Sequence, residues 1–252
     1  MKIRSIYEFI DSVAPYRTAA DWDNSGLNIG SMDREVRKVM VCLDITAQVA
    51  EEAARNRCGL IISHHPCIFS PVKNIDGDSI VYSLIRFNIA ALSAHTNFDR
   101  APGGVCDILA YFAGIDGLSD MMPEDSAVIG RIGTAPVSTL YAFVSKVKTA
   151  LSAPCVQYFD AGRSVHRVAV VSGAGGSEVE AAAMSGADTL LTGEASYHHW
   201  LEAKQYGINL VAAGHFETEN PAMRFLKTKL ENQFPDVEFE MSQTCTGIIE
   251  AM

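Results

Sequence analysis

A stretch of this chain that alternates apolar and amphipathic runs occurs twice. Residues 38–63 (KVMVCLDITAQVAEEAARNRCGLIIS) align without a gap with residues 167–192 (RVAVVSGAGGSEVEAAAMSGADTLLT). Each copy holds an apolar run, a segment with helical spacing and a second apolar run, which is the pattern of a strand, a helix and a further strand. The repetition therefore predicts two related α/β units. Duplication of one βαβ unit explains the likeness, and so does coincidence reinforced by the pattern that such folds share.

Strands and helices are expected to alternate along the rest of the chain. The apolar spacing predicts helices at 6–13, 46–57, 79–87, 103–112, 139–151 and 179–184, and a further helix that ends at residue 205. It predicts strands at 39–43, 60–62, 89–93, 168–171, 189–191 and 209–212, and two more near Val128 and Val156. Strands that alternate with helices of this length form largely parallel or mixed sheets flanked by helices. The expected fold class is therefore α/β, with two related, interleaved units.

A domain boundary is expected where glycine, proline and acidic residues gather between positions 116 and 126. We expect a first α/β unit that comprises 1–125 plus 212–252 and carries the candidate metal-ligating residues, and a second unit at 126–211. Because no linker is long enough to separate them, the units are expected to be docked or interleaved.

Composition excludes several classes of function. The net charge is −10 and the pI is about 5.1, and without a basic run nucleic acid is an unlikely partner. No stretch reaches the roughly 20 apolar residues that span a bilayer, so no membrane association is expected. The six dispersed cysteines lack a Cys-x-x-Cys motif and are typical of reduced thiols in the cytoplasm, with disulfides as the alternative.

Histidines and carboxylates follow the predicted strands in a repeated arrangement. The pair His64-His65 follows the strand at 60–62, while His95 and His215 each stand four positions before a carboxylate, Asp99 or Glu219. Side chains four apart share one face of a helix, and working groups of α/β sheets lie beyond the carboxyl ends of the strands. We therefore expect a metal centre with room for more than one ion at the junction of the two units.

Each of these residues also has a structural explanation. His64 and His65 could be imidazoles of a surface loop, and Asp99 could form a salt bridge with Arg100. His95 could donate a hydrogen bond to a ligand instead of binding metal. Glu219 could simply complement a helix macrodipole.

Other candidate groups carry weaker signals. Glu194 occupies the position in the second copy that matches His65, which makes it a candidate pocket carboxylate. The glycine-rich segment SGAGGSE (172–178) is expected to form a tight turn between a strand and a helix, because it lacks the spacing of a dinucleotide-binding loop and the lysine of a P-loop. For His198 and His199 a core or surface position is favoured, although one of them could face a cavity.

Five short motifs lie in order along nearly the whole chain. They are WDNSGL (22–27), SHHP (63–66), AHTNFD (94–99), TGEASYHH (192–199) and GHFETE (214–219), and Gly103-Gly104 follows the third. Together they resemble the GTP cyclohydrolase 1 type 2 family, also called the NIF-three-like dinuclear metal proteins. The chain is similar to the short form of that family, which lacks an inserted middle domain.

The resemblance implies a ligand set and an assembly. It implies that two divalent metal ions per subunit are held by His64, His65, Asp99, His215 and Glu219, with His64 and His65 on different ions and Glu219 bridging. It also implies a homohexamer that acts on a small-molecule or nucleotide substrate. Nitrogen and carboxylate donors without thiolate suit zinc, iron or manganese.

The activity expected from this resemblance is that of a metal-dependent hydrolase. In a GTP cyclohydrolase 1 type 2-like reaction, a metal-bridged hydroxide would attack C8 of GTP and formate would be released. His95 and Glu194 are the candidate catalytic residues for proton transfer. The alternatives are a metal-dependent phosphoesterase or amide hydrolase, and a non-catalytic metal-binding regulatory or interaction protein.

Overall fold

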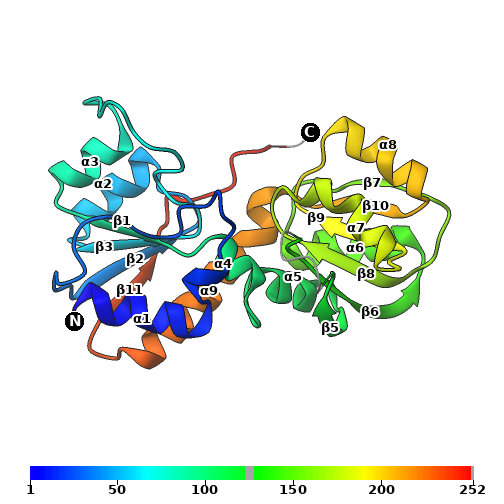
Figure 1. Cartoon of the computed structure of the whole chain (residues 1–252), viewed down its shortest axis with the longest axis horizontal. Helices are drawn as coiled ribbons and strands as arrows, with labels where there is room; N and C mark the ends of the chain where they lie inside the picture. Colours follow the sequence, from blue (N-terminus) through cyan, green and yellow to red (C-terminus); the bar gives the residue numbers. More distant parts are fainter. Residues whose placement is uncertain (123–127, 251–252) are drawn as a thin grey trace. The chain divides into compact units, whose positions relative to one another are not determined.

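The computed structural model describes residues 1–122 and 128–250. The chain forms two compact units, one made of Met1–Pro102 with Ala222–Thr246 and the other of Gly103–Pro221 with Gly247–Met252. It thus leaves the first unit, builds most of the second, returns to the first and ends in the second. Both units are α/β, with a mixed sheet flanked by helices, as expected (Figure 1).

The first unit is built on a five-stranded sheet with the order β1-β4-β3-β2-β11. Strand β1 is antiparallel to β4, and the other neighbours are parallel. The elements of this unit are α1 (Ile3–Val13), η1 (Tyr16–Thr18), β1 (Gly26–Ile29), β2 (Lys38–Cys42), α2 (Ala47–Arg55), β3 (Leu60–Ser63), α3 (Ile80–Arg86), β4 (Ala90–Ser93), α4 (Thr96–Arg100), the larger part of α9 (His215–Gln233) and β11 (Glu238–Met241).

Helices cover both faces of this first sheet. Met40 and Ile61 pack in one buried cluster with Val49 of α2 and Leu84 of α3. Figure 1 shows α1 and α9 on the opposite face. All four residues of β3 are buried, which explains why its sequence, LIIS, is a continuous apolar run instead of an alternating one.

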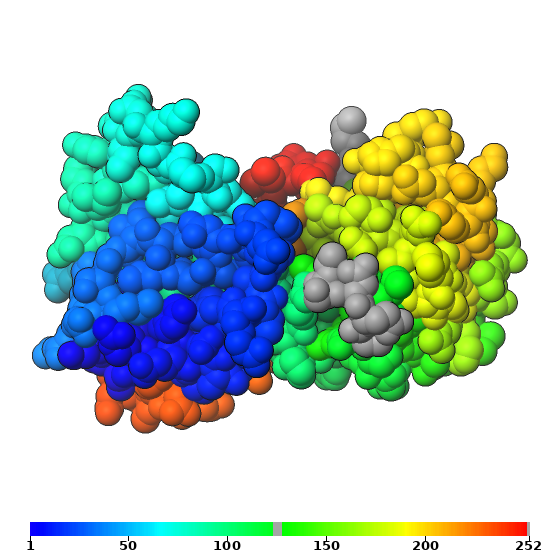
Figure 2. All heavy atoms as spheres, viewed as in Figure 1, coloured from blue at the N-terminus to red at the C-terminus, as the bar shows by residue number. Residues whose placement is uncertain are grey.

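Segments from the start and from near the end of the sequence pack together within the first unit. The rings of Phe9 and Phe234 lie edge to face with centroids 5.7 Å apart. In Figure 2 the blue atoms of the N-terminal segment adjoin the orange atoms of α9. The first unit is therefore completed by Ala222–Thr246.

The second unit is built on a six-stranded sheet with the order β5-β6-β8-β9-β10-β7. Strands β8, β9 and β10 are parallel, whereas β5, β6 and β7 pair in the antiparallel sense. Its elements are α5 (Val105–Ala113), β5 (Asp116–Asp120), β6 (Arg131–Ser138), α6 (Leu140–Leu151), β7 (Gln157–Phe159), β8 (Val165–Val171), η2 (Gly175–Glu178), α7 (Val179–Met184), β9 (Thr189–Thr192), α8 (Tyr197–Tyr206), β10 (Asn209–Ala212) and the first turns of α9.

Packing explains why the second unit begins at Gly103. On α5, Leu109 and Ala113 share a buried cluster with Phe143 and Val147 of α6. Helices α7 and α8 contribute to a separate cluster of this unit. The expected unit boundary between 125 and 126 lies outside the described residues.

The sequence also suggested that every metal ligand belongs to the first unit. The structure places His215 and Glu219 in the second unit, because the first turns of α9 pack there. The strand expected near Val128 begins at Arg131, and that near Val156 begins at Gln157. None of the helices in residues 1–122 and 128–250 has both the length and the apolar character that a membrane crossing requires.

Candidate metal centre

Three histidines gather at the carboxyl end of the sheet in the first unit. In the parallel register, Ser63 at the end of β3 pairs with Ser93 at the end of β4, so the residues that follow these strands emerge at one edge. His64, His65 and His95 each bring a ring nitrogen there, and the three nitrogens lie within 4.8 Å of one another. The prediction that His64 and His65 meet His95 at this edge is consistent with this geometry.

The Nδ1 atoms of His64 and His65 face hydrogen-bond acceptors. His64 Nδ1 lies 2.8 Å from the carbonyl oxygen of Ala94, and His65 Nδ1 lies 2.7 Å from Asp44 Oδ1. A carbonyl or ionised carboxylate oxygen can only accept, so each Nδ1–H donates and the lone pair is on Nε2. Histidines that bind metal are oriented in this way.

A buried carboxylate holds His95 in the same tautomer. His95 Nδ1 donates to Asp23 Oδ1 at 2.8 Å, and Asp23 also accepts from Ser25 Oγ and from the backbone and hydroxyl of Thr96. Burial alone would raise the pKa of Asp23, but the hydrogen bonds from His95, Ser25 and Thr96 outweigh it and lower that pKa. Asp23 is therefore an ionised acceptor that fixes the ring of His95.

Asp99 is the carboxylate of the first unit's cluster. It lies on α4, which begins directly after His95, and its Oδ1 is 3.5 Å from Nε2 of His64. The expected helical spacing between His95 and Asp99 is thus present. The nitrogen that Asp99 faces in this unit belongs to His64.

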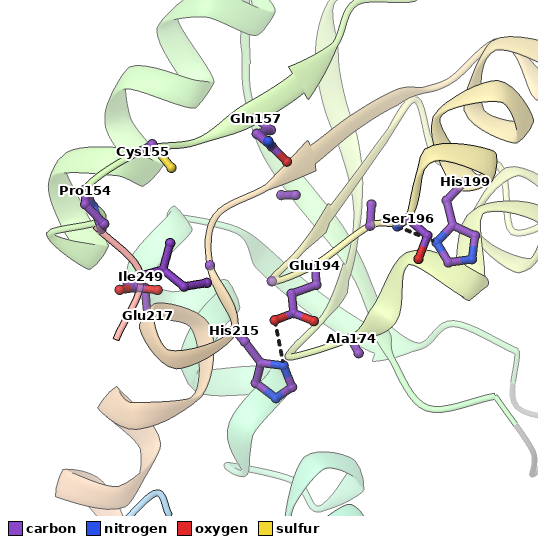
Figure 3. A pocket seen from close by; sticks show the side chains of 14 residues that line it. Pro154, Cys155, Gln157, Ala174, Glu194, Ser196, His199, His215, Glu217 and Ile249 are labelled. Carbon is purple, nitrogen blue, oxygen red and sulfur yellow. Dashed lines mark hydrogen bonds and ion pairs between the residues drawn. The ribbon is translucent and has the colours of Figure 1, made fainter. Parts of the chain in front are cut away.

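The second unit carries a nitrogen and a carboxylate at the start of α9. The helix begins at His215, and His215 Nε2 lies 3.1 Å from Glu219 Oε2 one turn later. His215 Nδ1 in turn lies 3.4 Å from Glu194 Oε1, a contact drawn in Figure 3. The predicted His-x3-Glu pair therefore shares one helix face, and Glu194 contacts its histidine.

Backbone packing around Gly173 makes room for this pair. Gly173 has φ +57°, and a Cβ at this position would collide with the Glu219 carboxylate and approach His215 Nε2. The Gly173 carbonyl accepts from the backbone N–H groups of Gly193 and Glu194, at 2.9 and 2.8 Å. The turn expected at 172–178 between β8 and α7 is present and includes η2, and Gly173 within it leaves the space that the Glu219 carboxylate occupies.

A cavity of about 360 Å³ opens beside His215 in the second unit. Glu194, Glu217, Gln157 and His199 are among the side chains that line it (Figure 3). His199 Nδ1 accepts from the backbone N–H of Ser196, and burial together with His198 lowers its pKa. Of the two adjacent histidines, His199 is therefore a neutral imidazole that lines the cavity.

The donor atoms in both units fit divalent metal ions. Two ligands of one ion with bonds of about 2.1 Å lie roughly 2.9 to 3.4 Å apart in octahedral or tetrahedral sites. The His64–Asp99 and His215–Glu219 distances are 3.5 and 3.1 Å. An imidazole lone pair and a carboxylate oxygen attract each other only through a shared proton or cation, so both pairs suit a bound cation.

Several residues of these sites were not anticipated from the sequence. Asp23 and Asp44 had no assigned role, although Asp23 lies within the WDNSGL motif and Asp44 closely follows an apolar strand. The six cysteines are free thiols, and Cys155 lines the cavity. His64, His65, His95 and Asp99 lie in the first unit, and His215, Glu219 and Glu194 lie in the second.

Known proteins share this architecture. A Clostridium perfringens protein named GTP cyclohydrolase 1 type 2 homolog is 32% identical, over 96% of this chain and 97% of its own length. A Helicobacter pylori protein named GTP cyclohydrolase 1 type 2 is 30% identical, over 86% of each. The crystal structure of a Staphylococcus aureus hypothetical protein superimposes with a TM-score of 0.90 at 28% identity, covering 100% of this chain and 99% of that one.

A family profile extends over nearly the whole sequence. It is described as Duf34/NIF3 (NGG1p interacting factor 3), and it matches residues 1–247. This range includes all the histidines and carboxylates of both units described above. The chain is therefore a member of the Duf34/NIF3 family.

Proposed function

We propose that this protein is a dinuclear metal-dependent hydrolase with GTP cyclohydrolase 1 type 2-like activity. The proposed ligands of two divalent ions are His64, His65, Asp99, His215 and Glu219, with zinc, iron or manganese as the candidate metals. The names of the relatives support the reaction class, since two of them are called GTP cyclohydrolase 1 type 2 or its homolog.

The observation that carries this proposal is the orientation of the histidines. His64 and His65 direct Nδ1 toward fixed acceptors, which leaves Nε2 as the donor atom for a ligand. Histidines that serve only to pack a core do not require a carboxylate at Nδ1 and a second carboxylate at Nε2. His215 has both, namely Glu194 and Glu219.

Two divalent ions would supply Lewis acidity that activates water and stabilises negative charge on the substrate. His95 is proposed to move a proton, because its Nδ1–H donates to the ionised Asp23 and the lone pair is therefore on Nε2. Glu194 is proposed to orient His215 and to accept a proton at the cavity wall, since its carboxylate is half exposed there. The cavity beside His215 is proposed to admit the substrate.

Formate release from GTP tests this reaction. The purified protein, stripped of metal and reloaded with zinc, iron or manganese, should release formate from GTP only when loaded. His64→Ala and Glu219→Ala should lose the activity while keeping the far-ultraviolet circular dichroism of the wild type. His166→Ala, which changes an exposed histidine outside the ligand set and the cavity lining, is the matched control and should retain it.

Other outcomes separate the alternative functions. Turnover of phosphoesters or amides without formate release from GTP would identify a different metal-dependent hydrolase. Metal binding without turnover of any of these substrates would favour a regulatory protein. Unchanged formate release after complete removal of metal would refute the dinuclear mechanism.

We also propose a homohexamer located in the cytoplasm. The proposed assembly follows from the family resemblance. Sedimentation velocity of the metal-loaded protein should give the mass of six chains of 27.3 kDa. A monomer or dimer at micromolar concentration would contradict it.

A further inference from the structure

Two large aromatic side chains stand beside the histidine cluster of the first unit without being buried. Trp22 is 65% exposed and Phe69 is 50% exposed. Their ring centroids lie 5.8 and 5.7 Å from the centroid of His95. Single exposed aromatic residues need no explanation, but here two of them, on separate loops, both contact the same imidazole of a polar site.

The ring faces of Trp22 and Phe69 are available for stacking. Both rings meet His95 edge to face, at interplanar angles of 74° and 89°. In this geometry the imidazole ring does not lie flat against the ring of Trp22 or Phe69. The large exposed fractions show that much of each ring is open to solvent.

The loops that carry these rings are tied together. Asn24 Nδ2 donates to the carbonyl oxygen of Ile68 at 2.6 Å, which joins the residues beside Trp22 and Phe69. Asp23, next to Trp22, is fixed by its hydrogen bonds to His95 and Thr96. An exposed apolar pair on a preorganised backbone loses little conformational entropy when it binds a rigid ligand.

We propose that Trp22 and Phe69 form a stacking site for a planar nitrogen heterocycle, such as a purine or pterin ring. The site is placed to hold that ring beside the imidazoles of His64, His65 and His95. One ring nitrogen from each of these histidines lies within 4.8 Å of the other two. Neither side chain carries charge, so the ring and not a phosphate chain is recognised. Identifying this ring with the substrate rests on the proposed function.

The stacking itself follows from the chemistry of the two side chains. A heterocyclic base presents a flat, polarisable face, and stacking on an aromatic side chain is largely independent of its substituents. Guanosine and inorganic triphosphate are therefore the discriminating probes, because each contains one half of GTP. Guanosine should bind at Trp22, whereas triphosphate alone should not.

Tryptophan fluorescence measures this binding without any turnover. The chain contains two tryptophans, Trp22 and Trp200, so Trp22→Phe provides the spectrum of Trp200 alone. Titration of the metal-loaded protein with guanosine should quench the emission of the wild type and leave that of Trp22→Phe unchanged. Inorganic triphosphate should quench neither, and free tryptophan corrects for absorption by the nucleoside.

Substitutions then test the contribution of each ring by calorimetry. Trp22→Ala and Phe69→Ala should each weaken guanosine binding by roughly 5- to 150-fold, the range that follows from losing one base–aromatic stack. Trp22→Phe keeps a ring and should retain more of the affinity than Trp22→Ala. Tyr82→Ala, which removes an aromatic ring that is 41% exposed on α3, is the matched control and should bind like the wild type.

The outcomes distinguish this inference from the proposed reaction. Quenching by guanosine without formate release from GTP would support the stacking site and refute the reaction. Formate release with an unchanged KM in Trp22→Ala and Phe69→Ala would support the reaction and refute the stacking site. Emission from Trp22 that acrylamide cannot quench in the free protein would mean that another chain covers the ring, and this would overturn the inference.

Discussion

Replacing Gly173 by alanine should weaken metal binding in the second unit without touching a ligand. The new Cβ would occupy the space of the Glu219 carboxylate and approach His215 Nε2. Two costs are expected, because the backbone at φ +57° disfavours alanine and because the side chain collides. The first costs roughly 1 to 2 kcal/mol and the second roughly 1 to 3 kcal/mol.

Gly162 provides a control that separates these costs. Its φ is +76°, and a Cβ there would meet nothing within 4 Å. Gly162→Ala therefore carries the backbone cost alone. If Glu219 stays in place, Gly173→Ala should unfold at a lower temperature than Gly162→Ala, by about 2 to 4 °C for each kcal/mol of difference.

The metal affinity decides whether Glu219 moves instead. If the carboxylate rotates away from the new Cβ, the thermal penalty shrinks and the affinity for zinc should fall roughly 10- to 100-fold, as it does when a supporting group is displaced. Competition with a chromogenic chelator measures this affinity, and differential scanning calorimetry measures the stability. Equal affinity and equal Tm in Gly173→Ala and Gly162→Ala would refute the packing argument.

Three further predictions concern other parts of the chain. Asp44→Asn should lower metal affinity roughly 10- to 100-fold, because it removes the carboxylate at His65 Nδ1. The Tm should change little because the Asp44 side chain is half exposed, and unchanged competition with the chelator would contradict the prediction. Zinc at 100 times its Kd should raise the free energy of unfolding by about 2.7 kcal/mol for each site, and this gain should shrink in His64→Ala. Glu52 accepts hydrogen bonds from Ser242 and Thr244, which outweigh burial and lower its pKa; its stabilisation should therefore be present above the ordinary glutamate pKa of about 4.3 and be lost as the pH falls through the lowered value. In urea titrations at pH 7 and pH 3, Glu52→Gln should differ from wild type more at pH 7, and equal differences at both would contradict the assignment.

The parallel core of the fold could be predicted from the sequence. Strands β3 and β9 are buried throughout, as are the residues 39–42 of β2 and 168–171 of β8, so these apolar runs are continuous and identify the strands directly. The strands at the edges of the sheets gave no comparable signal. Strand β11 has the sequence EFEM and pairs with β2, whose residues are distant in the chain, so its place depends on tertiary pairing.

The candidate ligands could be predicted better than the groups that support them. His64 and His215 stand at strand ends and before helices, and these local patterns are visible in the sequence. Asp23 bonds to a histidine 72 positions away, and an acidic residue in a polar loop is indistinguishable from a solvated one before the chain has folded. The role of Gly173 depends on contacts with α9, which no local pattern contains.

The interleaved path of the chain also determines the order in which its two units can fold during translation. A ribosome completes residues 103–221 as one continuous stretch, so the second unit has all but its last few residues before the first unit is complete. Strand β2 must wait for Glu238–Met241, and until then its outer backbone edge is open to pairing with other nascent chains. Truncation shortly before β11 is therefore expected to leave the first unit incomplete and to cause its aggregation. The second unit, most of which is residues 103–221, is expected to fold in the same truncated chain.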